Sequence, residues 1–382
     1  MGQLGIYIHI PFCQKKCNYC DFLSAPPRKQ GEQKRYVEAL GREIQREAKG
    51  YEGYRADTLF FGGGTPSLLQ EDELERLMAA LREGFQIEAD AEITMEVNPG
   101  TVSRAKLECY RRLGINRLSI GLQSADDEEL KELGRIHSWQ DFLTTWQAVR
   151  ECGFTNVNVD LISALPGQTK EGYENTLMKV LALRPEHISA YSLIIEEETP
   201  FYSRFGSGGE EAGRLPDEEE ERLMYERTGE LLLEHGYERY EISNYSRPGF
   251  SCKHNIGYWT GKEYLGLGLG ASSLIAHRRF SRERNLTAYI DKVMAEEGTV
   301  VWQESLSRQE EMAEFMFLGL RLTQGISLEE FKERFGTGSE EKYGKQIEGL
   351  IQKGLLYTPT EGRLALTKKG VDVSNQVFLE FL

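Results

Sequence analysis

Short apolar runs alternate with longer amphipathic stretches from the N-terminus to about residue 235. Short apolar runs bounded by turn residues predict buried strands, and apolar positions with a helical period predict helices. We expect strands at 5–10, 58–61, 93–97, 117–120, 156–161 and 188–194. We expect helices near 32–49, 71–84, 103–113, 126–133, 139–152 and 170–183. This alternation predicts an α/β fold, in which parallel strands joined by right-handed crossovers form a partial (β/α)6 barrel.

The remainder of the chain follows a different pattern. A glycine-rich polar stretch at 201–215 predicts a flexible loop, and a helix is expected at 217–235. The glycine-rich run 266–271 is expected to close over the barrel mouth. Further helices are expected at 312–322, 326–335, 342–353 and 367–378, with a small hairpin from 355–358 and 363–366. We therefore expect a barrel over 1–235, a closing segment over 236–300 and a winged-helix-like α+β domain over 301–382.

Composition and charge narrow the possible classes of protein. The chain has 382 residues, of which 40% are hydrophobic and 28% charged, as in an ordinary soluble protein with two or three domains. No apolar run approaches the ~18 residues of a membrane span, and no signal peptide is recognisable. The net charge of −15, without a basic patch, argues against nucleic-acid binding. Reduced thiols beside a metal centre would place the protein in the cytoplasm.

Three cysteines lie on one short loop directly after the first predicted strand, which ends at Pro11. They are Cys13, Cys17 and Cys20, half of the 6 cysteines in the chain. Three thiolates on one loop suit zinc or an iron–sulfur cluster. An ordinary electron-transfer cluster has four cysteine ligands, and a structural zinc site is closed by four ligands, so three leave one metal position open. A zinc site completed by His9 is the competing interpretation.

Polar and glycine residues also follow the other predicted strands. Glycines 62–64 follow the second strand and would let the backbone approach a ligand closely. A phosphate-binding loop is the other interpretation, but its Gly-Lys-Ser/Thr ending is missing. Glu96, Gln123 and Asp160 lie at the ends of later strands, and Arg135 follows the fourth strand. Because the carboxyl ends of barrel strands meet at one mouth, their recurrence predicts a shared ligand site.

The spacing Cys13-x3-Cys17-x2-Cys20, with Tyr19 before the last thiol, resembles the signature of radical S-adenosylmethionine (SAM) enzymes. In that superfamily three cysteines hold a 4Fe–4S cluster whose fourth iron binds SAM, and electron transfer from the cluster yields a 5′-deoxyadenosyl radical. The later motifs resemble those of the oxygen-independent coproporphyrinogen III oxidase family. That resemblance implies SAM contacts at Tyr7, Tyr19, Gly63, Gly64, Thr65, Glu96, Gln123, Arg135, Asp160 and Ile194.

A second informative stretch is His254-Asn255-x-x-Tyr258-Trp259. A histidine can ligate haem iron, and aromatic side chains can cover a macrocycle face. Taken alone, a histidine beside Tyr and Trp is more often a hydrogen-bonded core residue. The run, however, resembles the haem-binding motif of HemW-type haem chaperones, relatives of the porphyrinogen oxidase. This resemblance implies that His254 ligates haem iron and that Asn255, Tyr258 and Trp259 belong to the haem site.

Two departures from the oxidase pattern favour the chaperones. Asp21 and Phe22 follow Cys20, where the oxidase has a further cysteine, and the first strand begins near residue 5, without the oxidase's N-terminal extension. The resemblance thus implies a chaperone that carries a 4Fe–4S cluster and a SAM site and passes haem to apo-haemoproteins such as respiratory enzymes. It leaves open a homodimer and a peripheral contact with a membrane. The competing hypotheses are oxidative decarboxylation of coproporphyrinogen III propionates and a radical enzyme that opens or methylates haem.

Overall fold

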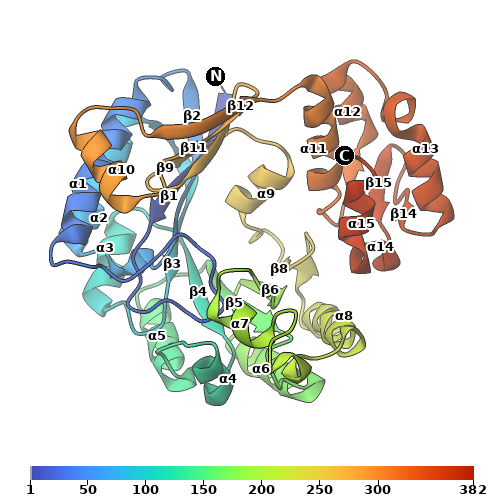
Figure 1. The fold of residues 1–382 in the computed structure, drawn as a ribbon, viewed down its shortest axis with the longest axis horizontal. Coiled ribbons are helices and arrows are strands. Elements are labelled where there is room, and N and C mark those ends of the chain that lie inside the picture. The colour runs from blue at the N-terminus through green and yellow to red at the C-terminus, as the bar shows by residue number, and fades with distance from the viewer. Residues whose placement is uncertain (1) are drawn as a thin grey trace.

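Six parallel strands in sequence order form the centre of the computed structural model, which describes residues 2–382. They are β1 (Gly2–Ile10), β2 (Tyr54–Gly63), β3 (Gln86–Val97), β4 (Arg117–Gln123), β5 (Val157–Ser163) and β6 (His187–Ser192). Each pairs in parallel with the next, and their apolar side chains supply much of the main core. The predicted parallel core is confirmed (Figure 1).

Helices between these strands cover the outer side of the sheet, as Figure 1 shows. They are α1 (Glu32–Ala48), α2 (Glu71–Gly84), α3 (Arg104–Arg112), α4 (Asp127–Glu132), α5 (Trp139–Glu151) and α6 (Lys170–Ala182), with a 3-10 turn η1 at Pro66–Leu68. Local sequence explains where several begin. Ser103, Asp126, Ser138 and Thr169 each cap a helix by accepting a backbone N–H hydrogen bond. None of the helices between residues 2 and 382 has the length and apolar character that a membrane crossing requires.

The sheet extends beyond the barrel strands on both sides, to twelve strands in the order β12-β11-β10-β9-β1-β2-β3-β4-β5-β6-β8-β7. The added strands are β7 (Glu238–Arg239), β8 (Asn244–Ser246), β9 (Tyr264–Leu267), β10 (Ser272–Ile275), β11 (Arg278–Arg282) and β12 (Val300–Ser305). The accompanying helices are α8 (Glu218–Glu234), α9 (Lys253–Trp259) and α10 (Leu286–Met294). The run 266–271 completes β9, which pairs in parallel with β1, and then turns into β10. That it closes the barrel mouth stays a prediction.

The prediction of a flexible loop at 201–215 is wrong. The segment contains α7 (Pro200–Phe205) and the 3-10 turn η2 (Ala212–Arg214). Phe201 and Phe205 lie one helical turn apart and are buried in a small apolar cluster. Arg204 between them forms ion pairs with two glutamates. The glycines after the helix dominate the composition of this stretch, and they obscured the two aromatic anchors in the sequence.

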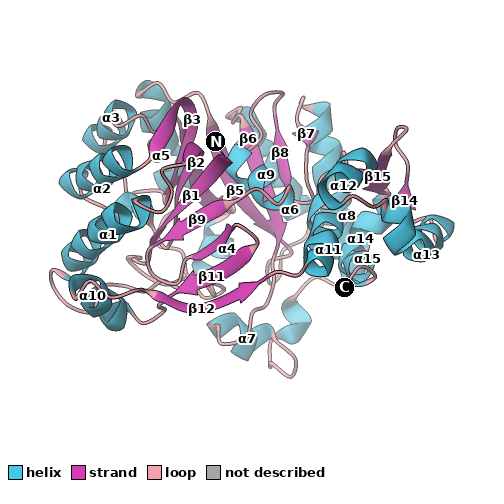
Figure 2. Ribbon diagram, turned by 90° about the horizontal axis from the view of Figure 1, so that it is seen from above, coloured by secondary structure: helices cyan, strands magenta, loops and turns pink. Residues whose placement is uncertain are grey.

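The C-terminal region has its own core and a small sheet. Its elements are α11 (Arg308–Gly319), β13 (Ile326–Ser327), α12 (Leu328–Phe335), α13 (Ser339–Gln352), β14 (Leu356–Tyr357), β15 (Arg363–Leu366), α14 (Lys368–Asp372) and α15 (Ser374–Leu379). β15 is the middle strand and pairs antiparallel with both neighbours. Figure 2 shows these helices and the hairpin gathered at one end of the molecule. The last predicted helix is divided in two at Val373.

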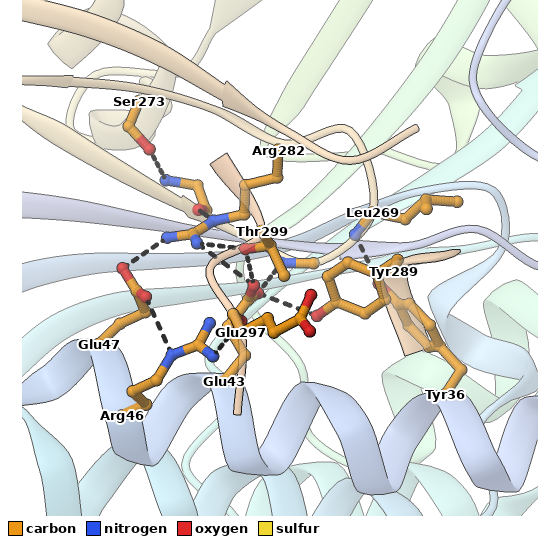
Figure 3. Close-up of polar contacts among 12 residues, drawn as sticks. Tyr36, Glu43, Arg46, Glu47, Leu269, Ser273, Arg282, Tyr289, Glu297 and Thr299 are labelled. Carbon is orange, nitrogen blue, oxygen red and sulfur yellow. Dashed lines mark hydrogen bonds and ion pairs between the residues drawn. The ribbon is translucent and has the colours of Figure 1, made fainter. Parts of the chain in front are cut away.

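A buried ion-pair network connects β11, one of the strands outside the six-stranded core, to helix α1 (Figure 3). Arg282 of β11 and Glu43 of α1 are both fully buried, with 3.2 Å between the guanidinium and the carboxylate. Arg282 also donates to Glu47 at 3.0 Å. The Glu43 carboxylate accepts hydrogen bonds from Tyr289 and Thr299 at 2.9 and 2.6 Å. A helix early in the chain is thereby joined to β11, to α10 and to the segment before β12.

Candidate functional site

The cysteine loop begins where β1 ends and is held at its base by backbone pairing. Phe12 forms an isolated parallel bridge with Ala25, and the Cys13 N–H donates to the Ala25 carbonyl at 3.2 Å. The Cys13 thiol is buried, the thiols of Cys17 and Cys20 are half-buried, and all three are free. The loop therefore carries three unbonded sulfurs at the C-terminal edge of the sheet.

His9 is engaged with protein groups on both sides of its ring. Its Nε2 lies 2.9 Å from the Leu23 carbonyl and its Nδ1 lies 3.0 Å from the Tyr7 hydroxyl. Burial lowers the pKa of His9, which favours the neutral ring. With both nitrogens used, His9 is not placed as a fourth ligand beside the thiols, contrary to the zinc interpretation. Among residues 2–382, no three His, Cys, Asp or Glu side chains lie close enough to share a single ion.

Glycines after β2 bring a second loop against the cysteine loop. A Cβ at Gly64 would lie 2.6 Å from the Phe12 carbonyl oxygen, so only glycine fits this close approach. The Thr65 N–H donates to the same carbonyl at 2.7 Å. Gly63 has a φ of 111° and its N–H donates to the Glu96 carboxylate at 3.1 Å. The ends of β1, β2 and β3 therefore meet at one place, as the sequence predicted.

Arg135 lies at the centre of a polar cluster beside the thiols. Its Nη2 donates to Asn98 Oδ1 at 2.7 Å and to the Gly121 carbonyl at 2.5 Å, and its Nη1 lies 3.6 Å from Cys17 Sγ. Asn98 in turn donates to the Thr65 hydroxyl at 2.8 Å. A cavity lined by Cys17, Thr65, Asn98 and Arg135 opens between these groups.

Two carboxyl groups lie further inside the barrel. Asp160 accepts hydrogen bonds from Asn158 at 2.8 Å and from Ser119 at 3.1 Å, and burial raises its pKa. Burial, together with the neighbouring Asp160, raises the pKa of Glu96 to about 8. Neither group is among the residues that line the cavity beside Arg135, but a cationic ligand that reached them would stabilise the ionised form of both. An amino-acid ammonium group therefore suits this part of the site.

The remaining residues of the predicted SAM set differ in backbone conformation, packing and exposure. Gln123 adopts a left-handed backbone, with a φ of 76°, at the end of β4. Tyr19 packs against the same small apolar cluster as Leu193 and Ile195, which follow β6. Ile194, between them, is 67% exposed. The structure thus places the segment of Ile194 beside the cysteine loop, while the Ile194 side chain itself lies in solvent.

His254 occupies the buried side of α9. Its Nδ1 is hydrogen-bonded with the Thr58 hydroxyl at 2.8 Å, and its Nε2 with the Tyr258 hydroxyl at 2.9 Å. The ring stacks on Phe60 with 5.1 Å between centroids. Burial lowers the pKa of His254 to about 3. In this arrangement the imidazole is a satisfied core group, and its role as a haem ligand stays a prediction that requires release from at least one of these partners.

The ends of α9 are fixed by two separate contacts. At its start, the Glu92 carboxylate accepts the backbone N–H of His254 at 3.1 Å, which complements the helix dipole. At its end, the Arg321 guanidinium lies 4.3 Å from the centroid of the Trp259 ring. Asn255 and Trp259 are half-buried. The helix that carries the predicted haem motif is therefore held by β3 on one side and by the C-terminal region on the other.

A chain of buried polar groups joins the two regions of the site. Asn158, which donates to Asp160, accepts from His187 Nδ1 across 2.6 Å. His187 Nε2 lies 2.8 Å from the Tyr240 hydroxyl, which accepts the Cys252 N–H at 3.3 Å directly before α9. The sequence analysis did not select these groups. Polar residues at alternate, inward-facing positions of β5 and β6 were the available signal.

Comparison with known proteins settles the family. The model of the Radical SAM superfamily matches residues 7–180, and that of the HemN C-terminal domain matches residues 306–373. Heme chaperone HemW of Lactococcus lactis is 38% identical over 98% of this chain and 96% of its own length. The chain belongs to the HemW family. Heme chaperone HemW of Bacillus subtilis is 36% identical over 98% of both chains.

The fold of this HemW-family chain also has a counterpart among solved structures. Coproporphyrinogen III oxidase (HemN) from Escherichia coli, described as a radical SAM enzyme, gives a TM-score of 0.87 with 26% identity. The match covers 100% of this chain and 90% of that one. The predicted radical SAM fold is thereby confirmed. Members of this superfamily are built around a 4Fe–4S cluster and SAM, so both groups are expected in the HemW family.

Proposed function

We propose that the protein is a haem chaperone that binds haem and delivers it to apo-haemoproteins such as respiratory enzymes. The observation that carries the proposal is the match to Heme chaperone HemW of Lactococcus lactis over 98% of this chain, together with the His254–Trp259 motif. The free state of all cysteines among residues 2–382 agrees with a reducing compartment, and we propose a cytoplasmic location. A homodimer and a peripheral membrane contact belong to the same proposal.

The chain would hold a 4Fe–4S cluster through Cys13, Cys17 and Cys20. Three free thiols on one loop, with the Arg135 guanidinium beside Cys17, are a suitable donor set for a negatively charged cluster. When bound, the cluster and SAM would supply one-electron chemistry. We propose that SAM is contacted by Tyr7, Tyr19, Gly63, Gly64, Thr65, Glu96, Gln123, Arg135, Asp160 and Ile194.

Within that set each group has a distinct task. Gly64 permits the close approach of its loop to the cysteine loop, and Glu96 and Asp160 would accept hydrogen bonds from an amino group or hydroxyls. Arg135 already contacts Cys17 and Asn98. It would therefore orient a carboxylate next to the cysteine loop.

For haem, we propose ligation by His254 within a site that includes Asn255, Tyr258 and Trp259. Since both ring nitrogens of His254 are hydrogen-bonded to protein groups, ligation must be preceded by breaking at least one of these bonds. Haem ligation is thus coupled to a movement of α9 or of the His254 side chain.

We expect His254→Ala to abolish the shift of the haem Soret band and to weaken haem binding by at least roughly tenfold, because the axial ligand is lost. The measurement is an absorbance titration of the full-length protein with haem. His277→Ala is a suitable control, since the His277 side chain is 74% exposed and lies outside the site. An unchanged Soret shift in His254→Ala would refute the ligand assignment.

We expect Thr58→Val to accelerate haem ligation by roughly fivefold, because it removes a hydrogen bond, worth about 1 kcal/mol, that holds His254 Nδ1 in place. Stopped-flow absorbance at the Soret band measures the rate. Thr58→Ser keeps the hydroxyl and should retain the slower rate. Equal rates for the two variants would show that this bond does not restrain the histidine.

A second candidate function is oxidation of coproporphyrinogen III, which the likeness to the Escherichia coli oxidase favours. The two functions differ in whether the porphyrinogen propionates are consumed. We retain the chaperone as the proposal, because relatives that match nearly the whole chain bear that name. The turnover test is given in the Discussion.

A further inference from the structure

A large groove lies between α8 and the C-terminal region. Its lining includes Leu233 and Tyr245 from the barrel side and Leu320 and Tyr357 from the C-terminal side. Tyr245 and Leu320 are buried, whereas Leu233 is 69% and Tyr357 43% exposed. Large apolar side chains left partly exposed along one groove mark a binding surface.

The floor of this groove is fixed by backbone contacts. Leu322 forms an isolated antiparallel bridge with Glu241. The Thr323 N–H donates to the Tyr240 carbonyl at 3.0 Å, and the Thr323 hydroxyl donates to the Arg239 carbonyl at 2.9 Å. The two sides of the groove are therefore joined along its base, so that its shape is set before a ligand arrives.

Three cations lie along the groove. Arg239 forms no ion pair within residues 2–382, and its Nη1 donates to the Tyr225 hydroxyl at 2.6 Å. Lys368 is 71% exposed and lies 3.3 Å from Glu226, which also pairs with another arginine. Arg321 pairs with Glu241 at 3.6 Å and stacks on Trp259 of the predicted haem motif. Glu226 and Glu230 also line the groove, so Arg239 is the lining cation that no carboxylate among the described residues pairs with, and Arg321 connects the groove to α9.

One buried polar group in the groove has no partner. Tyr245 is 1% exposed, and its hydroxyl has no hydrogen-bond partner. Such groups are rare in folded proteins, because an unpaired buried hydroxyl costs free energy. Because this hydroxyl has no exposed surface, it is not accessible to a ligand in the groove, and Tyr245 contributes only its ring to the lining.

We propose that this groove binds a haem-type tetrapyrrole, a flat apolar ring with two carboxylates, outside the His254 position. The ring would pack on the apolar walls at Leu233 and Tyr357, and its carboxylates would pair with Arg239 and Lys368. This inference rests on the proposed chaperone function and extends it. Because Arg321 connects the groove to Trp259, cargo held there lies next to the helix that must release His254.

Metal-free protoporphyrin IX tests the groove, because it has the ring and the carboxylates but no iron for a histidine to ligate. We expect Leu233→Asp and Lys368→Glu each to weaken its binding by roughly tenfold, measured by porphyrin fluorescence with the full-length protein. Leu223→Asp, on the same helix but outside the groove, and Lys369→Glu, the neighbour of Lys368, are matched controls. Both controls should bind as the unaltered protein does.

The possible outcomes distinguish a failure of the groove assignment from a failure of the proposed function. His254→Ala should leave protoporphyrin affinity unchanged while it abolishes the haem Soret shift. If the unaltered protein binds haem but not protoporphyrin, or if both groove variants bind like their controls, the groove assignment is refuted and the chaperone proposal stands. If the unaltered protein binds neither compound, the proposed function itself fails. Circular dichroism checks that each variant folds. We expect the variants at Leu233 and Lys368 to fold, because both side chains are exposed.

Discussion

Arg282→Met is expected to lower the free energy of unfolding by about 3–5 kcal/mol, because it leaves Glu43 as an uncompensated charge in the core. Both side chains are 0% exposed, and the arginine also donates to Glu47 and to the Gly266 carbonyl. The loss would separate α1 from β9, β10 and β11 rather than affect the surface alone (Figure 3). Urea unfolding followed by circular dichroism gives the difference.

Two further variants locate the cause of that loss. Arg279→Met lies on the same strand, at a partly exposed pair with Glu314, and should cost no more than about 1 kcal/mol. Adding Glu43→Gln to Arg282→Met removes the buried charge and should restore part of the stability. If Arg282→Met costs no more than Arg279→Met, the buried pair does not stabilise the fold as described.

Cys17→Ala is expected to eliminate the iron–sulfur cluster, because only Cys13 and Cys20 would remain on the loop as ligands. After anaerobic reconstitution, the variant should be colourless, should contain little iron and should lose SAM binding, as measured by calorimetry. Cys152→Ala is the control, since Cys152 is also a free, half-buried thiol but lies far from the loop in the chain. An unaltered protein that binds zinc instead of iron would refute the cluster assignment.

The same preparations decide between chaperone and oxidase. With reductant and SAM, the reconstituted protein should convert no more coproporphyrinogen III than Cys17→Ala does. Chromatography of the porphyrin products measures the conversion. Turnover above that background would overturn the chaperone as the main function and leave the haem motif as a secondary feature.

The central fold was predictable because its signals are local. Each barrel strand contains a short apolar run, and Ser103 and Asp126 cap the helices that follow β3 and β4. The outer strands were missed for physical reasons. β7 has only two residues, and β12 has three apolar residues followed by three polar ones, all exposed, so neither shows the longer apolar run or the alternation that predicts a strand.

The candidate site, too, was predictable from the sequence only in part. The cysteines and glycines can be recognised in the sequence by residue type and spacing, but the contacts of a side chain depend on the fold. Thr58, which is hydrogen-bonded with His254, lies 196 residues away in the chain. Asn98 follows Glu96 by two residues, yet only the folded structure shows that it joins Arg135 to Thr65.

The position of β1 in the sheet has a consequence for how the protein matures. β1 is an interior strand, and one of its two neighbours is β9, where residues 5–8 pair with residues 264–267. During synthesis, the strand made first must therefore wait with one unpaired edge until most of the chain has left the ribosome. The loop that extends from it acquires its final shape at the same late moment. A cluster held by that loop would therefore be inserted after translation, into a nearly finished polypeptide.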